Sequence, residues 1–153
     1  MTFEEELQRS GKIIFTNKGI SMMPLLRENK DVMIIEKCQP SDVKKFDAVL
    51  FTRKNKDKTR YVMHRVLRLN DDGSFFIAGD NCTAGERVVP EQILGRLIGV
   101  IRNGKRLDVS DKKYLLYVHI WCDAYPIRFG ILKIRNFAKR CIRYAKRRIR
   151  HEQ

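Results

Sequence analysis

Long hydrophobic runs are scarce in this sequence. The longest mainly apolar stretch, YLLYVHIWC at 114–122, is about half as long as a membrane-spanning helix needs to be, and the charged residues Asp123 and Arg128 follow it. The first ten residues, MTFEEELQRS, are acidic and contain neither the basic nor the apolar region of a secretory signal. We therefore expect neither a transmembrane helix nor a signal peptide.

Cysteine is also scarce, and its spacing excludes two kinds of site. The chain has four cysteines, Cys38, Cys82, Cys122 and Cys141. No two of them form the C-x-x-C pair typical of zinc sites, and none brackets a compact loop as in small disulfide-stapled domains. We expect free thiols in a reducing, cytoplasmic compartment, with no metal site and no cofactor.

Negative charge is in the minority, because 32 Lys and Arg stand against 18 Asp and Glu, for a formal net charge of +14. The excess is uneven, since residues 111–153 contain 12 of these basic residues and only 3 of the acidic ones. Of the 153 residues, 43% are hydrophobic, which is enough for a globular protein with a buried core. The sequence predicts a mildly basic body at 1–110 and a strongly basic extension at 111–153.

The body is predicted to be mostly β. Its β-branched and aromatic residues cluster in short segments separated by polar or glycine-containing turns, a pattern typical of antiparallel strands. A short helix should end near Gly11, 39–47 should be a turn or short helical connection, and NKDK at 55–58 should be a hairpin tip. Strands are expected at 12–16, 31–37, 48–54, 59–69 and 75–79, and 90–109 should hold a strand, an Asn103-Gly104 turn and a return strand.

The extension is predicted to be helical. One helix should begin after Ser110 or Asp111 and break at Pro126. Beyond it, apolar residues recur in steps of three and four and form one stripe on an otherwise basic helix: Ile127, Ile131, Ile134, Ala138, Cys141, Ala145 and Ile149. Three roles stay open for this helix: a solvated helix packed on the body, a helix on an anionic membrane surface, or a nucleic-acid contact. The last is disfavoured, because no aromatic platform or binding motif accompanies the charges.

Ser21 is the first candidate for chemistry. It lies in GISMMPLL, where Gly19 would let the backbone approach a substrate closely. Met22 and Met23 would pack beside the nucleophile or line an apolar subsite, and Pro24 would stiffen the exit from this segment. A serine becomes a good nucleophile only when a base takes its proton. The alternative role for Ser21 is a turn hydroxyl that caps the segment after it.

His64 is the candidate base. His151 lies near the end of the chain, and His119 lies in an apolar helical segment that favours a structural role. His64 lies mid-strand in YVMHRV, and with an ordinary pKa of about 6.5 it accepts a proton at neutral pH. Asp80, in a Gly-Asp-Asn turn after the strand at 75–79, is the candidate third group that would orient or electrostatically support His64. Its alternative role is an Asx-type turn.

Together these motifs resemble one family. The ordered set GISMMP, HRV and GDN resembles the type I signal peptidase and LexA-like serine peptidase superfamily, closest to the Ser-His branch of endoplasmic-reticulum and archaeal signal peptidases. KKFDAVLF at 44–51 is similar to the segment between the first two boxes, with Phe46 where glycine is usual. The matching positions are Gly19, Ser21, Met22 and Pro24 in the serine box, His64-Arg65-Val66 in the second box and Gly79-Asp80-Asn81 in the third.

The resemblance implies a fold and an activity. The fold would be a coiled antiparallel β domain that receives an extended peptide at a strand edge, followed here by the basic amphipathic helix. The activity would be that of a serine endopeptidase that cuts a precursor, leader or signal-like peptide after small residues. Ser21, His64 and Asp80 would be catalytic. Gly19, Met22, Met23 and Pro24 would bind substrate.

Departures from the family pattern bear on location and on function. Family signal peptidases are normally anchored in a membrane, and a peripheral position on the inner face of the membrane would supply that proximity here. An acidic cluster often follows the third box, where this sequence offers only Glu86. The alternative function is a non-catalytic regulatory or binding module of the same fold, which would bind membrane or nucleic acid through the basic helix. The joint presence of Ser21, His64 and Asp80 favours the enzyme.

Overall fold

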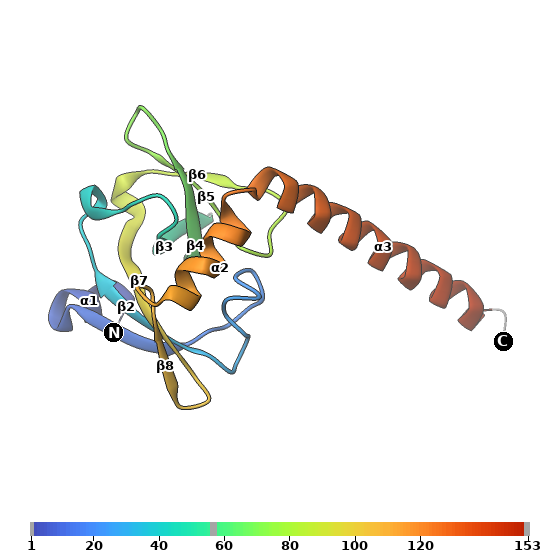
Figure 1. Ribbon diagram of the computed structural model, residues 1–153, viewed down its shortest axis with the longest axis horizontal. Coiled ribbons are helices and arrows are strands. Elements are labelled where there is room, and N and C mark those ends of the chain that lie inside the picture. Colours follow the sequence, from blue (N-terminus) through green and yellow to red (C-terminus); the bar gives the residue numbers. More distant parts are fainter. Residues whose placement is uncertain (1, 56–57, 152–153) are drawn as a thin grey trace.

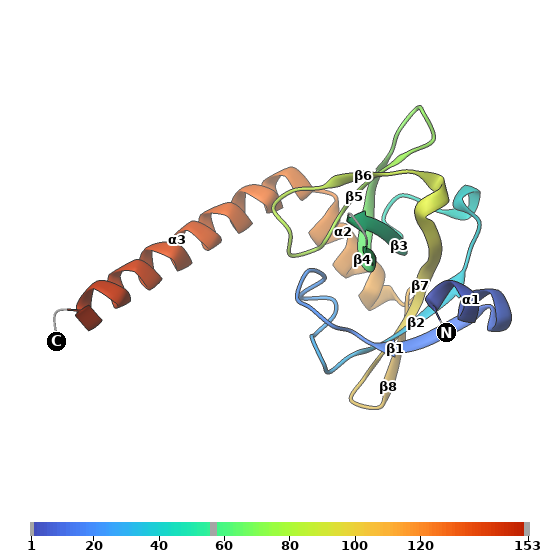
Figure 2. The same cartoon turned by 180° about the vertical axis from the view of Figure 1, so that it is seen from behind.

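The strands form one antiparallel sheet that does not close on itself (Figures 1 and 2). The computed structural model describes residues 2–55 and 58–151. The strand order is β1-β2-β7-β3-β4-β5-β6, with β8 paired to β7. The strands are β1 (Lys12–Thr16), β2 (Val32–Lys37), β3 (Ala48–Asn55), β4 (Lys58–Leu69), β5 (Phe75–Ala78), β6 (Glu86–Val88), β7 (Ile93–Arg102) and β8 (Lys105–Asp108).

The predicted mostly-β fold with a C-terminal helix is confirmed. Each expected strand is present, and the Asn103-Gly104 turn joins β7 to β8. The pattern missed only the short β6, which pairs with β5. Asn55 and Lys58 pair across the expected hairpin tip, whose residues 56–57 lie outside the described part of the chain.

Both faces of the central strands are buried, which explains their continuous apolar runs. On β3, Leu50 belongs to one apolar core, whereas Val49 and Phe51 belong to a second core. Successive side chains of a strand point to opposite faces, so a bent sheet with a core on each side requires an uninterrupted run such as AVLF at 48–51.

The first core also receives two helices, α1 (Phe3–Ser10) and α2 (Lys112–Cys122). Thr2 and Glu5 form a capping box at the start of α1, and Gly11 ends that helix at φ +70°. The residues of α2 buried in this core are Tyr114, Val118 and Cys122. The first helix of the predicted extension therefore shares the core of the β body.

α3 (Tyr125–His151) turns away from α2 and extends away from the sheet (Figures 1 and 2). Pro126 lies in its first turn, where a missing N–H breaks no helical hydrogen bond. Proline therefore ends the preceding helix, as predicted, and also begins the next. Arg128 and Leu132 are the only buried side chains among those described on α3.

The apolar stripe of α3 faces away from the body. Ile131 is 59% exposed and Ile134 is 71% exposed. At about 100° per residue, Arg128 and Leu132 point about 100–140° away from the centre of the stripe. The interpretation of α3 as a helix whose apolar stripe packs on the body is therefore wrong beyond this short contact.

One fully buried ion pair ties the helices to the sheet. On β4, Arg65 donates from Nε and Nη2 to the two carboxylate oxygens of Asp80, at 2.8 and 2.7 Å, and both residues are 0% exposed. The Tyr117 hydroxyl of α2 donates to the same carboxylate at 2.8 Å, and Trp121 Nε1 donates to the backbone oxygen of Asp80 at 2.9 Å. Arg128 of α3 lies 3.8 Å from the carboxylate. The pair thus joins β4, the turn after β5, α2 and α3.

We expect Asp80→Asn to lower the free energy of unfolding by about 3–5 kcal/mol, because it leaves the Arg65 charge buried without a counter-charge. Asp108→Asn, which breaks the exposed pair with Arg106, is the control and should cost about 1 kcal/mol or less. Urea unfolding followed by circular dichroism measures both values. Equal losses in the two variants would contradict the structural role of the pair.

Candidate active site

Ser21 lies in the loop between β1 and β2, residues 17–31, which we call the serine loop. Gly19 adopts φ +96°, a backbone conformation that favours glycine. Met22 is 1% exposed and belongs to the first core together with Leu25 and Leu26. Of the two roles expected for Met22, the structure supports packing beside the nucleophile: its side chain lies in the core beneath the loop and is not exposed for contact with a substrate.

The far end of the serine loop is held by a buried carboxylate. Asp31 is 0% exposed and accepts hydrogen bonds from Arg102 Nε at 3.0 Å and from the backbone N–H of Arg27 at 2.8 Å. Arg102 also donates to the backbone oxygen of Leu25 at 2.6 Å. Burial alone would raise the pKa of Asp31, but the hydrogen bonds from Arg102 and Arg27 hold it at about 2. The carboxylate is therefore ionised at neutral pH, and it fixes the loop to β7.

The Gly-Asp-Asn turn fixes the near end of the loop. Asn81 donates its backbone N–H to the Ser21 backbone oxygen at 2.7 Å and its side-chain amide to the Ile20 backbone oxygen at 3.1 Å. A methyl group at Gly79 would lie 2.6 Å from the Ser21 backbone oxygen and 3.0 Å from His64 Nε2. Only glycine leaves room there, so Gly79 lets the backbone of Ser21 and the imidazole of His64 be neighbours.

His64 lies in the middle of β4, opposite Val49 of β3, and is 7% exposed. Its Nδ1 faces Oε1 of Glu86, the first residue of β6, at 3.5 Å. Glu86 is held in turn by Arg53 of β3, whose Nε donates to Oε2 at 2.9 Å. The imidazole therefore has a carboxylate on its Nδ1 side and Gly79 on its Nε2 side.

The environment of His64 keeps the ring neutral. Burial lowers the pKa of His64 below its ordinary value of 6.5; the charge of Glu86 opposes this shift, and that of Arg53 adds to it. A neutral imidazole at pH 7 accepts a proton, and Glu86 is positioned to stabilise the imidazolium that then forms.

Asp80 does not contact His64 in the way that was predicted. Its carboxylate is taken up by Arg65 and Tyr117, and the carboxylate facing Nδ1 of His64 belongs to Glu86. The negative charge of Asp80 still raises the pKa of His64, after the larger effects of burial, Glu86 and Arg53. The structure thus supports an electrostatic contribution from Asp80 but assigns the orienting position to Glu86.

Ser21 and His64 line one cleft of about 880 Å³. Its walls come from β1, β2, β3, β4 and the turn after β5, and apolar side chains including Phe15, Met33 and Met63 contribute to them. No hydrogen bond joins the Ser21 hydroxyl to His64 among the described residues. The backbone N–H of Ser21 is likewise without an acceptor in this part of the chain, so it is available to bind an oxyanion.

Gly19, Met23 and Pro24, the other predicted substrate contacts, line a second hollow of about 730 Å³ on the other side of Ser21. Asn81 and α3 form its opposite wall. Ser21 and Cys82 line both hollows. We call the first hollow the cleft and the second the groove, and Ser21 lies where they meet.

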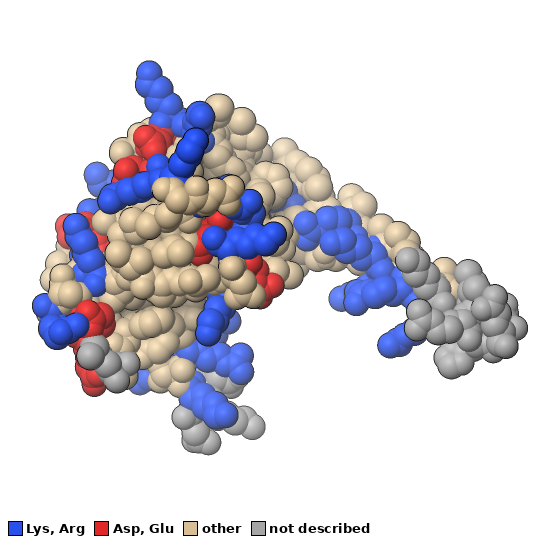
Figure 3. All heavy atoms as spheres, turned by 90° about the horizontal axis from the view of Figure 1, so that it is seen from below, with Lys and Arg blue, Asp and Glu red and all other residues tan. Residues whose placement is uncertain are grey.

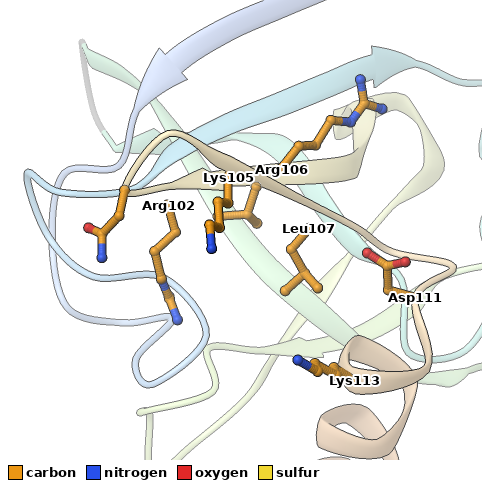
Figure 4. Close-up of a pocket in the computed structure, with 8 residues that line it drawn as sticks. Arg102, Lys105, Arg106, Leu107, Asp111 and Lys113 are labelled. Carbon is orange, nitrogen blue, oxygen red and sulfur yellow. The ribbon is translucent and has the colours of Figure 1, made fainter.

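Other features of the surface do not compete with Ser21 as a reactive centre. Burial raises the pKa of the Cys82 thiol, so the nucleophilic thiolate is disfavoured. A third hollow lies beside the β7–β8 hairpin (Figure 4), where Arg106 points away from Arg102 and Lys113. Arg102 and Arg106 are already paired with Asp31 and Asp108. No group of three or more potential metal ligands occurs among the described residues.

Comparisons with protein-family models, with curated proteins and with solved structures found no match. The resemblance of the ordered motifs to signal peptidases therefore stays a prediction, and the site is argued from its own geometry.

We expect the pKa of His64 to lie below 6.5 and to fall further in Glu86→Gln, because the substitution removes the charge that favours the imidazolium and leaves that of Arg53. Glu91→Gln, which changes an exposed acid after β6, is the matched control and should leave the pKa unchanged. NMR titration of the imidazole carbon shifts measures each value. A rise in the pKa of His64 in Glu86→Gln would contradict the assigned contact.

Proposed function

We propose that the protein is a serine endopeptidase in which Ser21 is the nucleophile and His64 the general base. The observation that carries the proposal is the convergence of Ser21 and His64 on one cleft, with Glu86 facing the other nitrogen of the imidazole. A serine nucleophile, a histidine base and a carboxylate beside that base form an arrangement that can carry out serine acyl transfer.

The first half of the reaction would form an ester on Ser21. As the Ser21 hydroxyl attacks the scissile carbonyl carbon, its proton passes to Nε2 of His64, and Glu86 stabilises the imidazolium. The free backbone N–H of Ser21 would bind the developing oxyanion. His64 then donates the proton to the leaving amine, and the carbon–nitrogen bond breaks.

The second half would release the acid. His64, neutral again, takes a proton from a water molecule that attacks the ester carbonyl. The proton returns to the Ser21 oxygen as the ester bond breaks. The lowered pKa of His64 keeps the ring in its proton-accepting form at neutral pH.

The cleft suits an extended peptide. β1 is an edge strand, and its residues Phe15 and Thr16 line the cleft. A peptide can therefore add to the sheet by pairing with this edge. The ordered motifs support the same substrate class, since the family they resemble cuts precursor, leader or signal-like peptides after small residues.

We expect the protein to cleave peptides that carry Ala-x-Ala before the scissile bond, and Ser21→Ala and His64→Ala each to lower kcat/KM by at least about a thousandfold. Ser10→Ala is the matched control, because its hydroxyl lies at the end of α1 outside the cleft. Mass spectrometry of the products locates the cut, and unchanged melting temperatures show that the variants fold. Cleavage that survives both substitutions would contradict the assignment of Ser21 and His64. No cleavage by the wild type would favour the non-catalytic module.

A second part of the proposal concerns location: α3 holds the protein on the inner face of an anionic membrane. Figure 3 shows Lys and Arg side chains gathered along one edge of α3 and uncharged residues along the other. Phe137 and Tyr144, 68% exposed each, flank the apolar stripe. An apolar face bordered by basic residues is the arrangement of helices that lie in the membrane interface. None of the helices in the described part of the chain has the length and apolarity to cross a bilayer.

The charge of α3 favours a lipid surface over a second copy of the chain. Residues 125–151 contain ten Lys and Arg and no Asp or Glu. Two such helices packed stripe to stripe would bring like charges together, whereas acidic headgroups attract the same charges. Because the stripe faces away from the body, α3 can bind the surface without leaving its place.

We expect the protein to bind vesicles of phosphatidylserine and phosphatidylcholine in a flotation assay, and Ile131→Asp/Ile134→Asp to lower the partition coefficient by at least about a hundredfold, since each buried isoleucine contributes about 1.5–3 kcal/mol. Ile14→Asp, at an isoleucine of β1 that is 64% exposed, is the control and should bind as the wild type does. Binding that the double substitution does not weaken would refute the surface role of α3.

A further inference from the structure

The groove gives the site a second binding surface that the ordered motifs do not predict. Ser21 lies at the junction of cleft and groove. A peptide whose scissile carbonyl reaches Ser21 from the cleft therefore continues into the groove. Basic side chains line both hollows: Lys18, Arg53 and Arg60 in the cleft, and Arg135 and Lys139 in the groove. The groove differs in that its basic side chains come from α3.

The basic wall of the groove comes from α3. Arg135 and Lys139 line it, one helical turn apart on the same face of the helix, together with Asn136. Among the described residues, no Asp or Glu lines the groove, and no carboxylate forms an ion pair with either Arg135 or Lys139. Neither positive charge is thus neutralised by a described carboxylate, so both can attract an anionic group of a ligand.

The position of Arg135 is set by the active site itself. Its Nη2 donates to Oδ1 of Asn81 at 2.8 Å, and Asn81 holds the backbone oxygens of Ser21 and Ile20. Through Asn81, Arg135 is therefore held at a defined position relative to Ser21. A positive charge at a defined position favours an acidic residue at one position of a bound peptide, whereas a mobile surface charge would attract any anion.

We propose that the groove binds the substrate segment that follows the scissile bond and selects an acidic side chain in it through Arg135 and Lys139. This inference rests on the proposed peptidase function, in which the residues before the scissile bond occupy the cleft. The preferred substrate would then carry a small residue before the cut and an aspartate or glutamate within the first few residues after it.

The test uses the full-length protein and a peptide series with Ala-x-Ala before the scissile bond. One Asp is placed at each of the first five positions after the bond in turn, with Asn at the same position as the neutral match; a second series places them before the bond. We expect Asp to exceed Asn in kcat/KM by about two- to fivefold at one or two positions after the bond, as for an exposed ion pair, and the ratio to shrink at high salt.

Substitutions in α3 assign the effect to the groove. Lys139→Gln should bring the Asp to Asn ratio toward one, and Lys139→Glu should reverse it. Lys44→Gln, which removes an exposed lysine far along the chain from α3 and absent from the groove lining, should leave the ratio unchanged. A wild type that cleaves with equal efficiency whichever residue follows the bond, or that prefers Asp only before it, would overturn the inference and leave the peptidase function standing.

Binding separates failure of this inference from failure of the proposed function. Fluorescence anisotropy with Ser21→Ala and the same labelled peptides measures affinity without cleavage. If the Asp peptide binds more tightly than the Asn peptide, and Lys139→Gln abolishes this difference, the groove binds acidic segments even if the wild type cleaves nothing. Equal affinities for the Asp and Asn peptides would overturn it.

Discussion

The buried ion pair between Arg65 and Asp80 is the constraint on which the rest of the structure depends. Two charges removed from water are tolerated only when geometry and hydrogen bonding are nearly complete, and here the Phe46 backbone oxygen and the Tyr117 hydroxyl complete them. The four residues Phe46, Arg65, Asp80 and Tyr117 come from four separate segments of the chain. Forming the ion pair with its hydrogen bonds therefore fixes the positions of all four segments. Asn81, adjacent to Asp80, then holds the backbone of Ser21. The position of the serine thus follows from an interaction in which it takes no part.

Because of this ion pair, the carboxylates of Asp80 and Glu86 have different surroundings. Asp80 is fully occupied by Arg65 and Tyr117 and acts on His64 only through its charge. Glu86 is partly exposed; its oxygens lie beside Arg53 and beside Nδ1 of His64. A carboxylate of this second kind can respond when the imidazole gains a proton, because its surroundings are not locked. In the proposed mechanism, the structural role of Asp80 and the chemical role of Glu86 would therefore be separate.

The strands and helices could be predicted from the sequence because their patterns are local. Alternation, turn residues and the apolar stripe predicted at 127–149 each depend on residues close together in the chain. Gly11 follows the end of α1, and Pro126 separates α2 from the helix after it, as predicted. The convergence of Ser21 and His64 could be anticipated only from the resemblance of ordered motifs. The sequence could not show that Glu86, and not Asp80, lies beside Nδ1 of His64. This depends on the hydrogen bonds of Asp80 with Arg65 and Tyr117, which form only when β4 and α2 pack together. The burial of Met22 has the same origin: whether a loop methionine faces solvent or core depends on the sheet beneath it.

α3 contacts the body through one side and leaves its apolar stripe on another. A membrane bound to the apolar stripe therefore does not compete with the body for the same side chains. Binding there would not require α3 to move away from the body. Confinement of such a protein to a surface would reduce its search for other surface-bound molecules from three dimensions to two. Encounter frequency would then be governed by lateral diffusion and by the density of molecules per unit area, rather than by their concentration in bulk solution.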